Sequence, residues 1–295
     1  MTGLLRRFNL DEPGSLKEVS SLLSRYGERG KILAGGTELL LAMKQGVLRY
    51  EHLINIKKIP GLDQIRYDEK EGRLTIGTLV THRALEKSDL IKERFPLIVE
   101  MERQIANIRV RTQGTIGGNL CWADPRSDVI ILLIALGARV KAVSLDGERV
   151  IPLEDFLIGY YETVLREDEI LTEIEIPGMA SDSKGAYLRF TRGERPIVGV
   201  AVVLTFGSGG EKIKDAVISL GCDNPPLRAR AAEECMRENA VSEVLANLKR
   251  SGEMASKGLD LKDDFHASAW YKREMVQVMV QQAIKEVCDR RKVTL

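Results

Sequence analysis

A strand, a glycine turn, a helix and a second strand follow one another near the start of this chain, and that order leaves few folds open. Residues 31–34 predict a short strand, Gly35-Gly36-Thr37 a tight turn, residues 38–44 a helix, and residues 52–56 the second strand. Two strands joined through a helix run parallel, with a right-handed crossover. We therefore predict a small parallel sheet at the N-terminus, preceded by a helix that begins with a capping box at Ser15 and Glu18.

The pattern changes from about residue 58, where a mixed α/β lobe is expected. Strands are predicted at residues 72–77, 139–144, near 150–151 and at 169–176, and helices after Thr81 and over 95–106. A second glycine turn covers residues 114–120. Residues 129–136 are apolar on every face and too few to span a membrane, which predicts a buried helix.

Small and polar residues at 177–185 indicate a linker, and another unit follows it. Strands are predicted at 186–191, 197–206 and 212–220, and helices at 228–238, 242–250 and 267–287. The fold class is thus α+β. A two-lobed domain over residues 1–177, with lobes of about 1–57 and 58–177, precedes a C-terminal domain over residues 178–295, which is a small antiparallel sheet with a helical bundle.

Composition removes several classes of function. The 295 residues contain 44 Lys and Arg against 43 Asp and Glu, so a net charge of +1 gives no general attraction to nucleic acid. No apolar run approaches the roughly 20 residues of a membrane span, and we expect a cytoplasmic protein. The four cysteines are far apart in sequence and only three histidines accompany them, so no metal site is predicted.

The two glycine turns carry the chemistry. Successive backbone N–H groups around Gly35-Gly36-Thr37, before a helix, form a nest that binds phosphate, and the absence of Cβ atoms allows close approach. A purely structural turn is the alternative for this motif taken alone. Neither the P-loop pattern nor the Rossmann G-x-G-x-x-G pattern is present. Two donor-rich loops, one from each lobe, would bind the two phosphates of a dinucleotide from opposite sides.

The residues around these turns resemble a known family. Leu33-Ala34-Gly35-Gly36-Thr37-Glu38-Leu39, Thr115-Ile116-Gly117-Gly118-Asn119, Ala123-Asp124-Pro125 and Asp128 together are similar to the FAD-binding subunit of the molybdenum hydroxylases. That family includes the medium subunits of xanthine dehydrogenase, carbon monoxide dehydrogenase and 4-hydroxybenzoyl-CoA reductase. Residues 156–163, 169–177, 219–221, 226–229 and 270–273 extend the resemblance almost to the end of the chain.

The resemblance implies a set of FAD-binding residues and no catalytic side chain. The pyrophosphate would be bound on one side by the first loop and on the other by the second, with Ile116 near the flavin. Asp128 would accept a hydrogen bond from a ribose hydroxyl, and Leu171 would be an apolar contact. From the residues alone, Asp128 is explained equally well as a carboxylate at the start of a helix, and Leu171 as a core residue. The implied residues are Leu33, Ala34, Gly35, Gly36, Thr37, Glu38, Thr115, Ile116, Gly118, Asn119, Asp128, Leu171, Tyr187 and Arg189.

Tyr187 matches an aromatic residue that the family places beside the flavin, and Arg189 a cation two positions on, where the family often has Lys. A core strand aromatic is the alternative for Tyr187. The chain departs from the family at residues 193–196, Gly-Glu-Arg-Pro, where an Asp usually follows the cationic pair.

The function implied is electron transfer through FAD within a complex. A partner chain would contribute [2Fe-2S] clusters, a large chain the molybdopterin, and NAD, a quinone or another molecule would accept the electrons. Two other functions remain open from the sequence: a flavin-free assembly subunit, and a self-sufficient flavin oxidoreductase of related fold.

Overall fold

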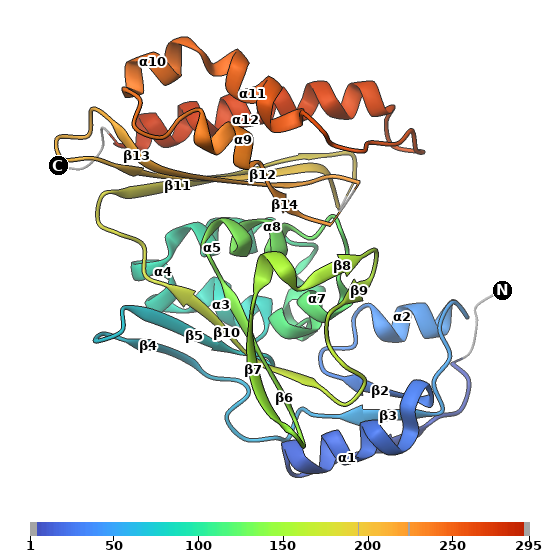
Figure 1. Cartoon of the computed structure of the whole chain (residues 1–295). Helices are drawn as coiled ribbons and strands as arrows, with labels where there is room; N and C mark the ends of the chain where they lie inside the picture. Colours follow the sequence, from blue (N-terminus) through green and yellow to red (C-terminus); the bar gives the residue numbers. More distant parts are fainter. Residues whose placement is uncertain (1–4, 194, 224, 292–295) are drawn as a thin grey trace.

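The computed structural model describes residues 5–193, 195–223 and 225–291. It shows two successive α+β units, as the sequence predicts: parallel and antiparallel sheets with helices first, then an antiparallel sheet covered by helices (Figure 1). In the described part of the chain, no helix is both long and apolar enough to cross a membrane.

The N-terminal lobe is the predicted parallel sheet with one additional strand. Its strand order is β1-β3-β2, and β3 pairs in parallel with both neighbours. Ser15 caps the first helix by accepting the Glu18 N–H at 3.3 Å, whereas the Glu18 carboxylate accepts from Gly14. The elements are β1 (Asn9–Asp11), α1 (Leu16–Tyr26), η1 (Gly27–Arg29), β2 (Gly30–Leu33), α2 (Leu39–Lys44) and β3 (His52–Asn55).

The second lobe has a five-stranded antiparallel sheet in the order β4-β5-β10-β6-β7. Its strands are β4 (Ile65–Asp68), β5 (Arg73–Gly77), β6 (Arg139–Ser144), β7 (Gly147–Pro152) and β10 (Ile170–Pro177). The 3₁₀ helix η2 (Leu153–Asp155) and a separate hairpin of β8 (Leu157–Gly159) and β9 (Glu162–Thr163) lie between β7 and β10 in sequence. Its helices are α3 (His82–Lys87), α4 (Asp89–Arg94), α5 (Pro96–Glu102), α6 (Ile108–Gln113), α7 (Ile116–Trp122) and α8 (Asp128–Ala135).

Two predictions for this lobe need correction. The helix expected over 95–106 is α5 alone and ends at Glu102, because the chain turns there and Ala106 has a left-handed φ of 38°. The second glycine turn is not a turn throughout: Thr115 caps α7, whose first residues are Ile116 and the two glycines. The buried apolar helix is confirmed as α8, every residue of which is buried.

The C-terminal sheet has the order β11-β12-β13-β14, with every pair antiparallel. Its strands are β11 (Ser183–Thr191), β12 (Pro196–Phe206), β13 (Ile213–Gly221) and β14 (Leu227–Arg228). Its helices are α9 (Arg230–Glu234), α10 (Val241–Ala246), α11 (Leu248–Ser256) and α12 (Ala269–Arg290). The single helix expected over 242–250 is wrong, because α10 ends at Ala246 and α11 begins at Leu248, with Asn247 between them.

The C-terminal sheet is covered on both faces. Its own helices lie on one face, and α8 of the preceding lobe packs against the other (Figure 1). Gly199 and Gly221 make this close approach feasible, since a Cβ on Gly199 would meet Ile131 of α8 at 2.6 Å. The packing joins the C-terminal unit to the lobe that carries the second glycine segment.

Candidate functional site

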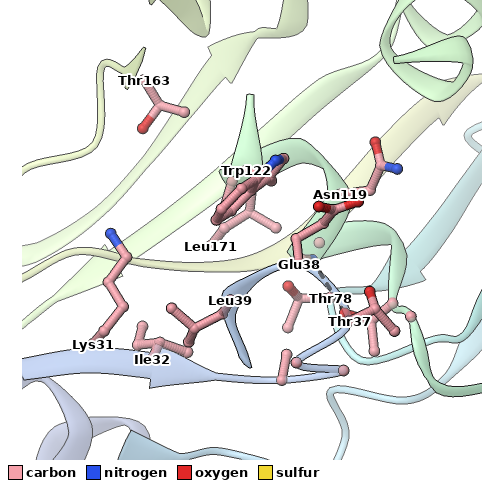
Figure 2. A pocket seen from close by; sticks show the side chains of 18 of the residues that line it. Lys31, Ile32, Thr37, Glu38, Leu39, Thr78, Asn119, Trp122, Thr163 and Leu171 are labelled. Carbon is pink, nitrogen blue, oxygen red and sulfur yellow. Dashed lines mark hydrogen bonds between the residues drawn. The ribbon is translucent and has the colours of Figure 1, made fainter. Parts of the chain in front are cut away.

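A cavity of about 830 Å³ lies where the two glycine segments meet (Figure 2). This volume falls in the range of small-molecule and cofactor sites. Both lobes line it, and the C-terminal unit adds Arg195. The polar and glycine lining therefore comes from segments far apart in the sequence, as expected for a ligand bound between lobes.

The first glycine segment presents unused hydrogen-bond donors to the cavity. Within the described part of the chain, no hydrogen bond uses the backbone N–H groups of Gly36, Thr37 or Glu38. Gly36 has a φ of 73°, in the left-handed region that favours glycine. A Cβ on Gly35 would overlap the carbonyl oxygen of Gln113, so this glycine allows the first segment to touch the chain just before the second.

The second glycine segment is more tightly held. Ile116 and Gly117 donate their N–H groups to the carbonyls of Val80 and Thr78, and Gly118 donates to the Thr115 hydroxyl at 3.1 Å. A Cβ on Gly118 would meet only that hydroxyl within 4 Å, at 2.9 Å. A ligand in the cavity can therefore come close to the backbone at Gly118.

Ten of the residues implied by the resemblance line this cavity: Ala34, Gly35, Gly36, Thr37, Glu38, Thr115, Gly118, Asn119, Asp128 and Leu171. Four others lie outside the lining: Leu33, Ile116, Tyr187 and Arg189. Leu33 packs with Leu39 and Met43, and Ile116 is 1% exposed in the core. Tyr187 is 6% exposed and belongs to the core of the second lobe, which is the environment of the alternative considered for it from sequence.

Asp128 connects the cavity with the strand that carries Tyr187 and Arg189. The Tyr187 hydroxyl donates to Asp128, and an Arg189 nitrogen lies 3.4 Å from its other oxygen. Burial raises the pKa of Asp128 to about 6, although the guanidinium and the tyrosine hydroxyl both favour its ionised form. Tyr187 and Arg189 thus contact Asp128, which lines the cavity, and do not line it themselves.

Several functional candidates give no clear signal in the sequence. His82 is the first residue of α3, as expected, but it also lines the cavity and is hydrogen-bonded through Nδ1 to the buried Glu102 at 3.0 Å. Trp122 is a lining residue whose buried Nε1 has no hydrogen-bond partner among the described residues. Arg195, immediately before β12, contacts Glu38 and Asp124. The described residues hold no group of three or more His, Cys, Asp or Glu able to bind a metal ion.

Comparison with known proteins identifies the family. Residues 6–179 match the FAD binding domain in molybdopterin dehydrogenase, and residues 187–287 match the CO dehydrogenase flavoprotein C-terminal domain. The chain belongs to the FAD-binding medium subunits of the molybdenum hydroxylases. FAD is therefore its cofactor, and the free donors of the first glycine segment and the open approach at Gly118 fit its pyrophosphate.

Two relatives match over nearly their whole length. The carbon monoxide dehydrogenase medium chain of Hydrogenophaga pseudoflava is 32% identical, covering 96% of this chain and 98% of that one. The 6-hydroxypseudooxynicotine dehydrogenase complex subunit alpha of Paenarthrobacter nicotinovorans is 30% identical, covering 95% and 94%. Carbon monoxide dehydrogenase from H. pseudoflava, in a structure lacking the Mo-pyranopterin moiety, superimposes with a TM-score of 0.92 over 98% of this chain and 99% of that chain.

Proposed function

We propose that this subunit transfers electrons from [2Fe-2S] clusters of a partner chain, through FAD, to NAD or to another acceptor such as a quinone. The observation that carries the proposal is a cavity lined by two glycine segments with unused backbone donors, in a chain of the FAD-binding family. Bound flavin supplies redox chemistry that accepts electrons singly or in pairs.

The chain itself binds and orients the cofactor. We assign the pyrophosphate to the N–H groups of Gly36, Thr37 and Glu38 and to the open approach at Gly118. Asp128 holds a ribose hydroxyl, and Leu171 is an apolar contact in the lining. These residues exclude water and fix the cofactor's position, and no side chain is assigned a proton-transfer role.

Other subunits complete the proposed enzyme. The names of the relatives, medium chain and subunit alpha, describe parts of complexes. The four cysteines of this chain are spaced too widely in sequence for an iron–sulfur motif. We assign the clusters to a small [2Fe-2S] chain and the molybdopterin to a large chain, in a cytoplasmic complex. Within this subunit, residues 1–177 are the proposed FAD-binding domain and 178–295 the C-terminal domain.

The alternatives predict different behaviour. A flavin-free assembly subunit has no use for the unused donors of the first glycine segment. A self-sufficient flavin oxidoreductase turns over substrate without partners. The chain expressed alone should bind FAD and hydroxylate no aldehyde or heterocycle, and the chain expressed with its genomic neighbours should co-purify with an iron–sulfur chain. Substrate turnover by the lone chain would contradict the proposal.

The electron path has its own test. In the complete complex, Gly118→Val should deplete FAD, because the added side chain fills the approach to the pyrophosphate. We expect this variant to lose substrate-dependent reduction of the physiological acceptor while still reducing ferricyanide, a one-electron oxidant that the iron–sulfur chain can reach. Loss of both activities to the same degree, with all subunits still present, would argue against FAD as the exit for electrons.

A further inference from the structure

Arg195 connects the C-terminal unit with both sides of the FAD cavity. It lies immediately before β12 and lines the cavity. One guanidinium nitrogen contacts Asp124, which follows α7, and another lies 2.7 Å from Glu38, which follows the first glycine segment. A single side chain thus joins two carboxylates that are 86 positions apart in sequence and belong to different lobes.

The cavity lining contains more acidic than basic residues, so the contacts of Arg195 with Glu38 and Asp124 affect the binding of an anionic ligand. Seven Asp or Glu residues line the cavity against four Lys or Arg residues. The pyrophosphate of FAD is itself anionic, so carboxylates beside it oppose binding. Glu38 and Asp124 flank the two glycine segments, and Arg126 is a further cation near Asp124, with Nε at 3.9 Å. Arg195 approaches both carboxylates more closely than that.

We propose that Arg195 is a positioning residue for FAD: it neutralises Glu38 and Asp124 and holds the two lobes together around the cofactor. The inference rests on FAD binding by this chain and not on the electron path. It assigns a role to Arg195 in the stretch 193–196, where we expect the chain to depart from its family and of which the structure describes all but residue 194. Removing one member of such a cluster leaves the other charges uncompensated.

Retention of FAD by the full chain tests the proposal. Arg195→Met should raise the FAD dissociation constant about five- to tenfold at low salt, as expected for the loss of two partly exposed ion pairs. The difference from wild type should narrow at high salt, which screens the repulsion that the variant creates. Arg195→Lys should restore part of the affinity, because it keeps the charge but not the two-pronged geometry.

Two further variants separate charge compensation from loss of structure. Arg230→Met is the matched control, because Arg230 also joins the C-terminal unit to the FAD domain, through Glu154 at 2.9 Å, and neither residue lines this cavity. It should leave FAD affinity unchanged. The double variant Arg195→Met with Asp124→Asn should bind FAD more tightly than Arg195→Met alone. Wild-type affinity in Arg195→Met, an equal loss in Arg230→Met, or no recovery in the double variant would overturn the proposal. Failure of the wild type to bind FAD at all would instead overturn the function.

Discussion

Tyr187 of β11 donates its hydroxyl hydrogen to Asp128, the first residue of α8, and this buried pair joins the C-terminal sheet to the FAD domain. Asp128 also faces the cavity. The Asp128 carboxylate therefore contacts Tyr187 on one side and faces the cofactor site on the other. Its ionisation is expected to affect both.

The stability of the protein should depend on the protonation of Asp128. Burial raises the pKa of this carboxyl to about 6 from an ordinary value of 3.8, so between about pH 4 and 6 the folded chain binds the proton more strongly than the unfolded chain. The stabilisation is complete below about pH 4 and is lost as the pH rises through 6. The two pKa values correspond to about 3 kcal/mol at most.

Urea unfolding of wild type and Asp128→Asn between pH 4 and 7 measures this effect. Taking the difference between the two proteins removes the contribution of other carboxylates. The free energy of unfolding of wild type should fall relative to that of the variant as the pH rises. A difference that stays constant across this range would show that Asp128 keeps one protonation state.

The glycines of the two segments should respond differently to alanine. Gly118→Ala should weaken FAD binding while lowering the melting temperature less than Gly36→Ala does, because its φ is not in the left-handed region and its new Cβ meets only the capping hydroxyl of Thr115. Gly36→Ala should lower stability by about 1 kcal/mol or more, because its φ of 73° strains any L side chain and the Cβ would meet Leu33 at 2.9 Å. Flavin absorbance and thermal melting of both variants separate the effects. Equal melting temperatures for the two variants would contradict this assignment.

Local sequence patterns predicted the parts of the fold that depend on local chemistry. The glycine segments are recognisable because close approach to backbone or ligand requires glycine, and α8 because residues 129–136 are apolar on every face. Strand β1 was not predicted, since its three residues carry little periodicity and gain their pairing from β3, more than 40 positions later. The break between α10 and α11 likewise gives no proline or glycine signal at Asn247.

The sequence predicts the parts of the candidate site that the backbone of the glycine segments forms, and not the side-chain contacts between units. Side-chain contacts that cross between units leave no pattern in a single sequence: Arg195 meets Glu38 across 157 positions, and Asp128 meets Tyr187 across 59. The resemblance to a family supplied Tyr187 and Arg189 as flavin contacts, and the structure places both behind Asp128, outside the cavity lining. Their direct contact with FAD remains a prediction without support from the lining.

The buried pair of His82 and Glu102 should be a strong determinant of stability. Glu102 is 0% exposed and both of its oxygens lie within 3.2 Å of His82 Nδ1. His82→Leu should lower the free energy of unfolding by about 1 to 3 kcal/mol, because it leaves a buried carboxyl group without that hydrogen-bond partner. The double variant with Glu102→Leu should recover much of the loss. Urea denaturation of the three proteins provides the measurement, and a double variant less stable than His82→Leu would exclude this account.

Trp122 should contact bound FAD. Its side chain lines the cavity, as do those of Leu171 and Glu38 (Figure 2), and its buried indole Nε1–H lacks a hydrogen-bond partner in the described part of the chain. An unpaired buried donor is costly, and because Nε1 is shielded from the cavity, a turn of the indole must bring it to an acceptor on the ligand. Trp122→Phe, which removes the donor and keeps an aromatic ring, should weaken FAD binding about fivefold, the value of one ordinary hydrogen bond.

The chain has only two tryptophans, so nuclear magnetic resonance of the ¹⁵N-labelled indoles tests this contact directly. Trp270 is 70% exposed, lies on α12 and does not line the cavity, which makes it an internal control. On saturation with FAD, the Trp122 indole signal should shift and its proton exchange with water should slow, because the proton becomes hydrogen-bonded. The Trp270 signal should stay in place. An unmoved Trp122 signal in protein shown by absorbance to hold FAD would place the cofactor away from this wall and contradict the prediction.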